Sequence, residues 1–284
     1  MGLFSSFRSA AERQAPEIVR PRLELSGEAL AEALRSLVES AEEHGGIERY
    51  VEAVRLRSAL FRDVLGGGAE MLEPDRFAAL CAFMPTVRRR IAPYLDPGGF
   101  ALMRNALAEL LTGMSDVVGC DARIASFTGR FPQDKGHRFV RDLAAEVLHN
   151  LDPERYPLMT RWVWDAKANT GVLREIWFGD DVDHLTLTVD DSYATFVALR
   201  EELAQYLTAN GVFRDMPQYI DALCAQVYAQ YICSQGGAYL RTDFSAAEDP
   251  MLHSRRMLGL DGFERLQAVA GRGSRAAGPP KRIG

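Results

Sequence analysis

The sequence predicts a mainly α-helical protein that carries one small antiparallel β-hairpin or three-stranded meander near residues 160–189. Apolar residues recur at helical spacing along most of the 284-residue chain, and glycines or prolines separate these segments at short intervals. Only residues 156–189 contain a long stretch that alternates like a strand. Helices that are joined by such short connections typically pack as antiparallel neighbours.

The composition is typical of a globular protein, with 47% apolar and 25% charged residues. The net charge of −6 argues against general nucleic-acid binding, which requires an excess of lysine and arginine. No apolar stretch approaches the length that crosses a bilayer, and the first residues lack the apolar core of a signal peptide. We therefore expect a cytoplasmic protein, and the alanine-, arginine- and leucine-rich composition favours a bacterial source.

A helical subdomain is predicted over residues 26–114, after a flexible N-terminal segment. Ser26 is a favourable N-cap for the first helix, and the second helix covers residues 47–65 between glycine-containing turns. Prolines then divide residues 74–97 into short helices, because proline suits the first turn of a helix and breaks its interior. A further apolar stripe at residues 100–111 completes this subdomain.

The second half of the chain is predicted to begin after a loop or linker at residues 115–135, where helical periodicity disappears. Residues 136–270 then hold a strong helix, the β-meander and the C-terminal helices. The flexible segment at the start covers residues 1–25. Residues 271–284 contain basic residues without any acid, between glycines and a proline pair, so we expect a disordered basic tail.

The predicted hairpin contains all three tryptophans of the chain. Residues 160–165 and 172–178 alternate on either side of a turn at residues 169–171, whose Asn-Thr-Gly sequence favours a hairpin. In this register the tryptophans share one face, and residues 185–189 add a third strand. The face is either part of the core or a binding surface.

The leading functional prediction is a non-catalytic accessory or assembly factor that binds a protein partner. Aromatic and arginine side chains on the hairpin are typical of binding hot spots. A Gly-rich loop after Cys233 offers backbone amides and a guanidinium to a ligand, although a helix C-cap also explains its glycines. The predicted partner- or ligand-binding residues are Trp162, Trp164, Arg174, Trp177, Gly236, Gly237 and Arg241.

The alternative is an enzyme with a small-molecule or metal pocket between helices. Glu146 and His149 have the Glu-x-x-His spacing of carboxylate-bridged di-iron bundles, but the chain has no second copy of it. Arg138 and Asp142 extend the same stripe, so we expect a solvated polar face and no metal or other cofactor. The residues of the enzyme hypothesis are His137, Glu146, His149, Arg241 and Asp243.

Two further features concern redox state and membranes. Four cysteines without a Cys-x-x-Cys pair predict reduced thiols instead of a zinc site or a disulfide framework. Leu3, Phe4 and Phe7 are spaced to form the apolar side of a short helix that touches a membrane, with a frayed terminus as the alternative.

Overall fold

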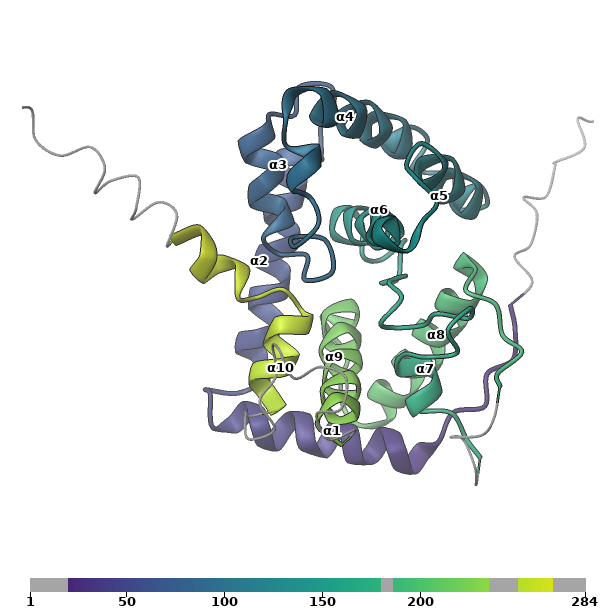
Figure 1. Ribbon diagram of the computed structural model, residues 1–284. Coiled ribbons are helices and arrows are strands. Elements are labelled where there is room, and N and C mark those ends of the chain that lie inside the picture. Colours follow the sequence, from purple (N-terminus) through teal and green to yellow (C-terminus); the bar gives the residue numbers. More distant parts are fainter. Residues whose placement is uncertain (1–19, 180–185, 235–249, 268–284) are drawn as a thin grey trace, which may run out of the picture.

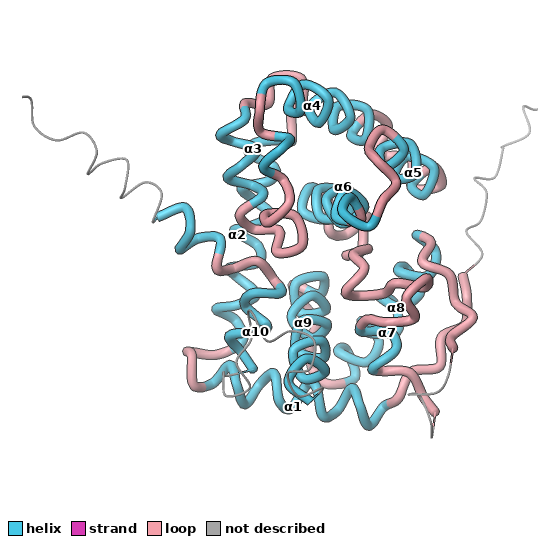
Figure 2. The backbone as a smooth tube through the Cα atoms, viewed as in Figure 1, coloured by secondary structure: helices cyan, strands magenta, loops and turns pink. Residues whose placement is uncertain are grey.

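The computed structural model describes residues 20–179, 186–234 and 250–267. This part of the chain is mainly helical, as the sequence predicts, and it contains no β-strand (Figures 1 and 2). Its strand-like pairings are isolated bridges between Leu25 and Trp177 and between Asp165 and Thr170. Within the same ranges, no helix combines the length and the apolar character that a membrane crossing requires.

The helical elements differ widely in length, and long connections precede and follow α7. In chain order they are α1 (Gly27–Glu42), α2 (Ile47–Leu65), α3 (Pro74–Cys81), the 3-10 helix η1 (Ala92–Tyr94), α4 (Pro97–Leu111), α5 (Cys120–Gly129), the 3-10 helix η2 (Lys135–His137), α6 (Phe139–Leu151), α7 (Val172–Glu175), α8 (Tyr193–Ala209), α9 (Met216–Ser234) and α10 (Pro250–Met257).

The helices α1 and α2 confirm the capping signals of the sequence. The Ser26 hydroxyl accepts the Ala29 N–H at 3.3 Å, which satisfies one of the free donors in the first turn of α1. Gly45 and Gly46 then turn the chain into α2 with φ angles of +94° and +90°. Glycine adopts this conformation without the steric cost that a Cβ atom adds.

Two central helices organise the molecule. α6 lies near the middle of Figure 1, where it contacts α2, α4 and α5. α9 is the second centre, and α1, α2, α7, α8 and α10 pack around it. The long helix α2 contacts both α6 and α9, so it joins the two halves of one continuous apolar core.

The structure places a helix where the sequence predicted a loop or linker at residues 115–135. Cys120, Ile124 and Phe127 of α5 lie at helical spacing and are buried, and α5 packs against α4 and α6. Only three apolar positions on one face carry this pattern, which is too short a stripe to stand out between glycines. Tertiary packing therefore decides the conformation of this segment.

The predicted β-hairpin or three-stranded meander near residues 160–189 is wrong for the residues that the structure describes. The two arms do meet, because Val172 N donates to Trp162 O at 3.1 Å. Gly171 then turns the chain at φ +122° into the helical turn α7, and no ladder extends beyond this point. The tight turn was predicted correctly, but the strands on either side of it were not.

Helical packing explains this difference. Val172, Leu173 and Ile176 are all buried, and their spacing fits one face of a helical turn as well as it fits a strand. The predicted third strand is also missing from its described residues, where the Leu187 N–H donates to the Asn169 side chain at 3.0 Å. A side-chain acceptor thus satisfies a backbone donor that a sheet ladder would have used.

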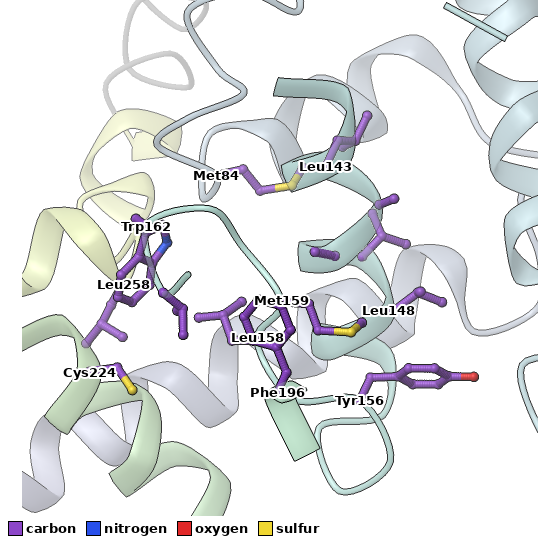
Figure 3. Packing of buried hydrophobic residues seen from close by; sticks show 14 of the residues in the cluster. Met84, Leu143, Leu148, Tyr156, Leu158, Met159, Trp162, Phe196, Cys224 and Leu258 are labelled. Atoms are coloured by element: carbon purple, nitrogen blue, oxygen red, sulfur yellow. The ribbon is translucent and has the colours of Figure 1, made fainter. Parts of the chain in front are cut away.

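The tryptophans contribute to the core. Trp164 is 0% exposed, and its indole N–H donates to Asp190 O at 3.0 Å. Trp162 is 5% exposed and lies among the other buried side chains in Figure 3, with its ring centroid 5.7 Å from that of Tyr228. Trp177 is partly buried against the same core. Of the two interpretations of the tryptophan face, core packing therefore describes Trp162 and Trp164.

Candidate functional site

The polar residues of α6 are buried, which contradicts the solvated face that the sequence predicted. Asp142, Glu146, His149 and Asn150 are at most 2% exposed, and only Arg138 of this stripe is partly exposed. Periodicity identifies the more polar side of a helix, but it cannot reveal that other elements offer matching polar groups to that side. α2, α9 and the turn after α6 supply those groups here.

His149 is held between two hydrogen-bond acceptors. Its Nδ1 lies 2.8 Å from Tyr156 O, and its Nε2 lies 2.8 Å from Asp221 Oδ2. Each acceptor requires a proton on the ring nitrogen, so the arrangement fits the doubly protonated imidazolium. Burial lowers the pKa of His149, but the Asp221 carboxylate and the Tyr156 carbonyl outweigh this effect and raise it above its usual value.

His149, Glu146, Asn150 and Asp221 form what we call the histidine cluster, and Arg57 of α2 joins it to the segment after α10. Its Nε donates to Asn150 Oδ1 at 2.9 Å, and one Nη donates to Leu258 O at 2.6 Å. The other Nη lies 3.6 Å from Asp221 Oδ2. A buried charge that is paired in this way fixes how α2, α6, α9 and the segment after α10 fit together.

Glu146 is the least favourably placed charge in the cluster. Burial raises the pKa of Glu146 to about 7, although Arg57 and His149 act in the opposite direction. Asn150 Nδ2 donates to Glu146 O at 2.8 Å and lies 3.4 Å from its Oε2. Glu146 therefore changes its charge near neutral pH inside the core.

The histidine cluster offers little space for a substrate. The cavity beside His149 and Asp221 measures about 20 Å³, which is room for about one water molecule. Cys224 also lines it, but burial strongly raises the pKa of this thiol, and the Asp221 charge adds to the effect. A neutral thiol is a poor nucleophile, so the geometry describes a structural polar core.

A much larger cavity of about 620 Å³ opens at the N-terminal end of α6. Its walls come from the end of α5, the loop that leads to η2, η2 itself, the first turn of α6, the segment between α6 and α7, and Asp191 in the loop before α8. We call this cavity the basic basin, because five of its lining side chains are cationic: Lys135, Arg138, Arg141, Arg161 and Lys167.

Carboxylates and a backbone carbonyl hold two of the basin arginines in place. Arg161 donates from Nε and Nη2 to the two oxygens of buried Asp142, at 3.2 and 2.6 Å. Arg141 donates to Asp191 O at 2.7 Å, and the same nitrogen lies 3.1 Å from the Asp191 carboxylate. These paired contacts hold both guanidinium groups in a defined orientation.

The other cations of the basin differ in how they are engaged. Arg138 pairs with the carboxylate of Asp165, which is 8% exposed. Lys135 and Lys167 are exposed, and neither makes a hydrogen bond or an ion pair with the described part of the chain. Their ammonium groups therefore have all three donors free for solvent or a ligand.

His137 also lines the basin, and its Nδ1 lies 2.8 Å from Asp134 Oδ1. Glu146 and His149, two further residues of the enzyme hypothesis, lie in the histidine cluster and do not line the basin. Arg241 and Asp243 lie outside the described residues. The residues that the structure describes from this hypothesis are therefore divided between two separate places.

The predicted partner-binding residues are also dispersed. Trp162 and Trp164 are core residues, whereas Trp177 is partly buried and Arg174 donates to Asn169 O at 3.0 Å. The remaining three, together with the residues of the membrane hypothesis, lie outside the described residues: Gly236, Gly237, Arg241, Leu3, Phe4 and Phe7.

Sequence reasoning missed the basic basin because its cations come from distant segments. Lys135, Arg138 and Arg141 recur every three residues from η2 into the first turn of α6, which is a recognisable local signal. Arg161 and Lys167 reach the same cavity only through the fold. The scarcity of lysine is a second signal in the sequence. The chain contains 30 arginines but three lysines, and two of those lysines line the basin.

Comparisons with protein-family models, with curated proteins and with solved structures found no match for this chain. Within the residues that the structure describes, no group of three or more His, Cys, Asp or Glu side chains is arranged to hold a metal ion. The assignment of a site therefore depends on its geometry and charge.

Proposed function

We propose that this protein binds a small anionic ligand in the basic basin. One observation carries the proposal: five cationic side chains converge on a single cavity in a chain whose net charge is −6. The volume of about 620 Å³ lies within the range of about 300–1,000 Å³ that is usual for small-molecule sites. A local excess of cations in a concave site attracts anions and raises their local concentration.

The charge balance of the basin supports an anion. Three carboxylates line the cavity with the five cations, and buried Asp142 neutralises Arg161 from behind. One positive charge is left in excess when His137 is neutral, and two when it is protonated. The cationic groups of the basin without an ion-pair partner in the described part of the chain are the ammonium groups of Lys135 and Lys167. A bound anion would therefore contact them without breaking an existing ion pair.

The arginines support the proposal by their fixed orientation. Binding costs less free energy when the groups that face a ligand are already ordered. Arg141 and Arg161 are held by contacts that do not involve solvent, so they shape the positive wall of the basin before a ligand arrives. The flexible lysines then adapt to the ligand.

The proposal is tested by titrating the full chain with inorganic phosphate, sulfate and citrate at low ionic strength, using calorimetry. The double variant Lys135→Gln, Lys167→Gln should weaken binding of the best of these anions about tenfold, because two exposed ionic contacts of about 0.5–1 kcal/mol each are lost. Arg62→Gln is the matched control, since Arg62 is exposed and lines none of the described cavities. No binding of any of these anions to the wild-type protein would overturn the proposal.

Binding of a protein partner is the second candidate function, and one observation favours it. Phe178 is 64% exposed and follows Trp177, which lines a cavity of about 560 Å³ together with Arg20 and Arg22. Exposed aromatic groups near arginine are typical of binding surfaces. Phe178→Ser should therefore reduce recovery of a specific partner in affinity purification, whereas Phe213→Ser, at another exposed phenylalanine, should not. Equal recovery with both variants would rule out this surface.

A further inference from the structure

The lining of the basic basin restricts the chemistry of the ligand. Among the described residues that line it, the His137 imidazole is the only ring that could stack on a base, and the apolar side chains are Pro132, Val140 and Ala168. Nucleotide bases and other flat apolar groups are normally held by aromatic or apolar contacts. The basin therefore suits a ligand that is polar over its whole surface.

The two lysines indicate the form of the negative charge. Lysine and arginine differ in their recognition of anions, since an ammonium is a compact point charge that binds phosphate from any direction, whereas a guanidinium is a planar fork that matches carboxylates and phosphates. The chain contains 30 arginines, yet two of its three lysines line this cavity. Two unpaired ammonium groups beside the guanidinium groups of Arg141 and Arg161 suit a phosphate group, whose several oxygens can accept from both kinds of donor.

The α5 side of the basin presents hydrogen-bond acceptors. Gln133 Nε2 donates to Thr128 O and to Phe131 O, both at 2.7 Å, which leaves its side-chain carbonyl oxygen without a partner among the described residues. The Thr128 hydroxyl donates to Ala125 O at 3.0 Å, so its oxygen is free to accept. A ligand that meets this wall needs hydroxyl or similar donors.

From these three observations we infer that the basic basin takes the phosphate monoester of a small polyhydroxylated molecule. The inference rests on the proposed function and specifies its ligand class. Lys135 and Lys167 contact the phosphate, and Gln133 and Thr128 accept hydrogen bonds from the hydroxyl groups. The phosphate contributes most of the affinity, whereas the hydroxyl contacts select the ester over the inorganic anion.

The test measures dissociation constants of the full chain for glycerol 3-phosphate, inorganic phosphate, adenosine 5′-monophosphate and succinate under the same conditions. Glycerol 3-phosphate should bind about thirtyfold more tightly than inorganic phosphate, because two hydroxyl contacts of about 1 kcal/mol each are added to the phosphate contacts. It should also bind more tightly than succinate, which lacks the phosphate, and than adenosine 5′-monophosphate, whose base finds few aromatic or apolar partners in the lining. Gln133→Met and Thr128→Val should each reduce its advantage over inorganic phosphate several-fold, while inorganic phosphate itself binds as before.

The outcomes separate this inference from the proposed function. If adenosine 5′-monophosphate or succinate binds as tightly as glycerol 3-phosphate, the ligand class is wrong but the anion site stands. The same conclusion follows if the ester has no advantage over inorganic phosphate, or if both variants leave that advantage unchanged. If no anion binds to the wild-type chain, the proposed function fails and the inference fails with it.

Discussion

Glu146→Gln should make the protein more stable above neutral pH. Burial raises the pKa of Glu146 from its usual 4.5 to about 7, which means that the folded protein disfavours the ionised carboxylate. One pKa unit corresponds to about 1.4 kcal/mol, so the ionised side chain costs ~3 kcal/mol relative to the unfolded chain. Glutamine cannot ionise, and it retains a carbonyl oxygen that can accept from Asn150.

The sign of the pH dependence follows from the raised pKa. The favourable contribution of Glu146 is complete below pH 4.5, falls as the pH rises from 4.5 to 7, and is lost above pH 7. Relative to the wild-type protein, the Gln variant should therefore gain up to ~3 kcal/mol between pH 5 and pH 8. Other titrating groups are common to both proteins, so the difference isolates Glu146.

The assay is urea unfolding of both proteins at several pH values between 5 and 8, followed by circular dichroism. Glu39→Gln is the matched control, because Glu39 is exposed on α1 and its removal should change stability by less than about 0.5 kcal/mol at every pH. If the Glu146 variant is less stable than the wild-type protein at pH 8, and the difference does not vary with pH, the reasoning is refuted. Glu146 would then be an ionised partner of Arg57 and His149.

Two further predictions concern packing and thiol access. Gly259→Ala should lower the free energy of unfolding in urea by about 2–4 kcal/mol, because φ is +69° and a Cβ atom would lie 1.8 Å from Phe83 O. Gly67→Ala, with open space around it, should lower it by less than about 1 kcal/mol. Equal losses in the two variants would contradict the close packing of Gly259 against Phe83. The exposed thiol of Cys233 should react with an aromatic disulfide reagent in the folded protein, whereas the three buried thiols should react only after unfolding. Rapid reaction of all four thiols in the folded protein would show that Cys81, Cys120 and Cys224 are not buried.

Local signals in the sequence predict much of the helical framework. The Ser26 cap and the glycine turn at residues 45–46 define α1 and α2 because the hydrogen bonds and φ angles involved depend on adjacent residues. The short elements α5 and α7 were missed for the opposite reason. Their few apolar residues fit a loop or a strand equally well, and only packing against other helices selects the helical form.

The candidate site was harder to predict than the fold. The polar stripe of α6 has the pattern of a solvated face, and its burial depends on Arg57 and Asp221, which lie far away in the sequence. The basic basin likewise joins Lys135 at the start of η2 with Lys167 in the turn before α7. A pattern within one helix contains no information about such contacts, whereas the scarcity of lysine in the sequence was an unused signal.

The most direct test of the anion site uses the small number of lysines. Reductive ¹³C-methylation of the full chain labels Lys135, Lys167, Lys281 and the N-terminal amine while retaining their positive charge. Phosphate is then titrated and followed by ¹³C–¹H NMR, with the lysine signals assigned by single Lys→Arg variants. The Lys135 and Lys167 signals should shift together and saturate with one dissociation constant, while the Lys281 signal stays unchanged. If no lysine signal shifts, or if all three shift alike without saturation, the basic basin is not an anion-binding site.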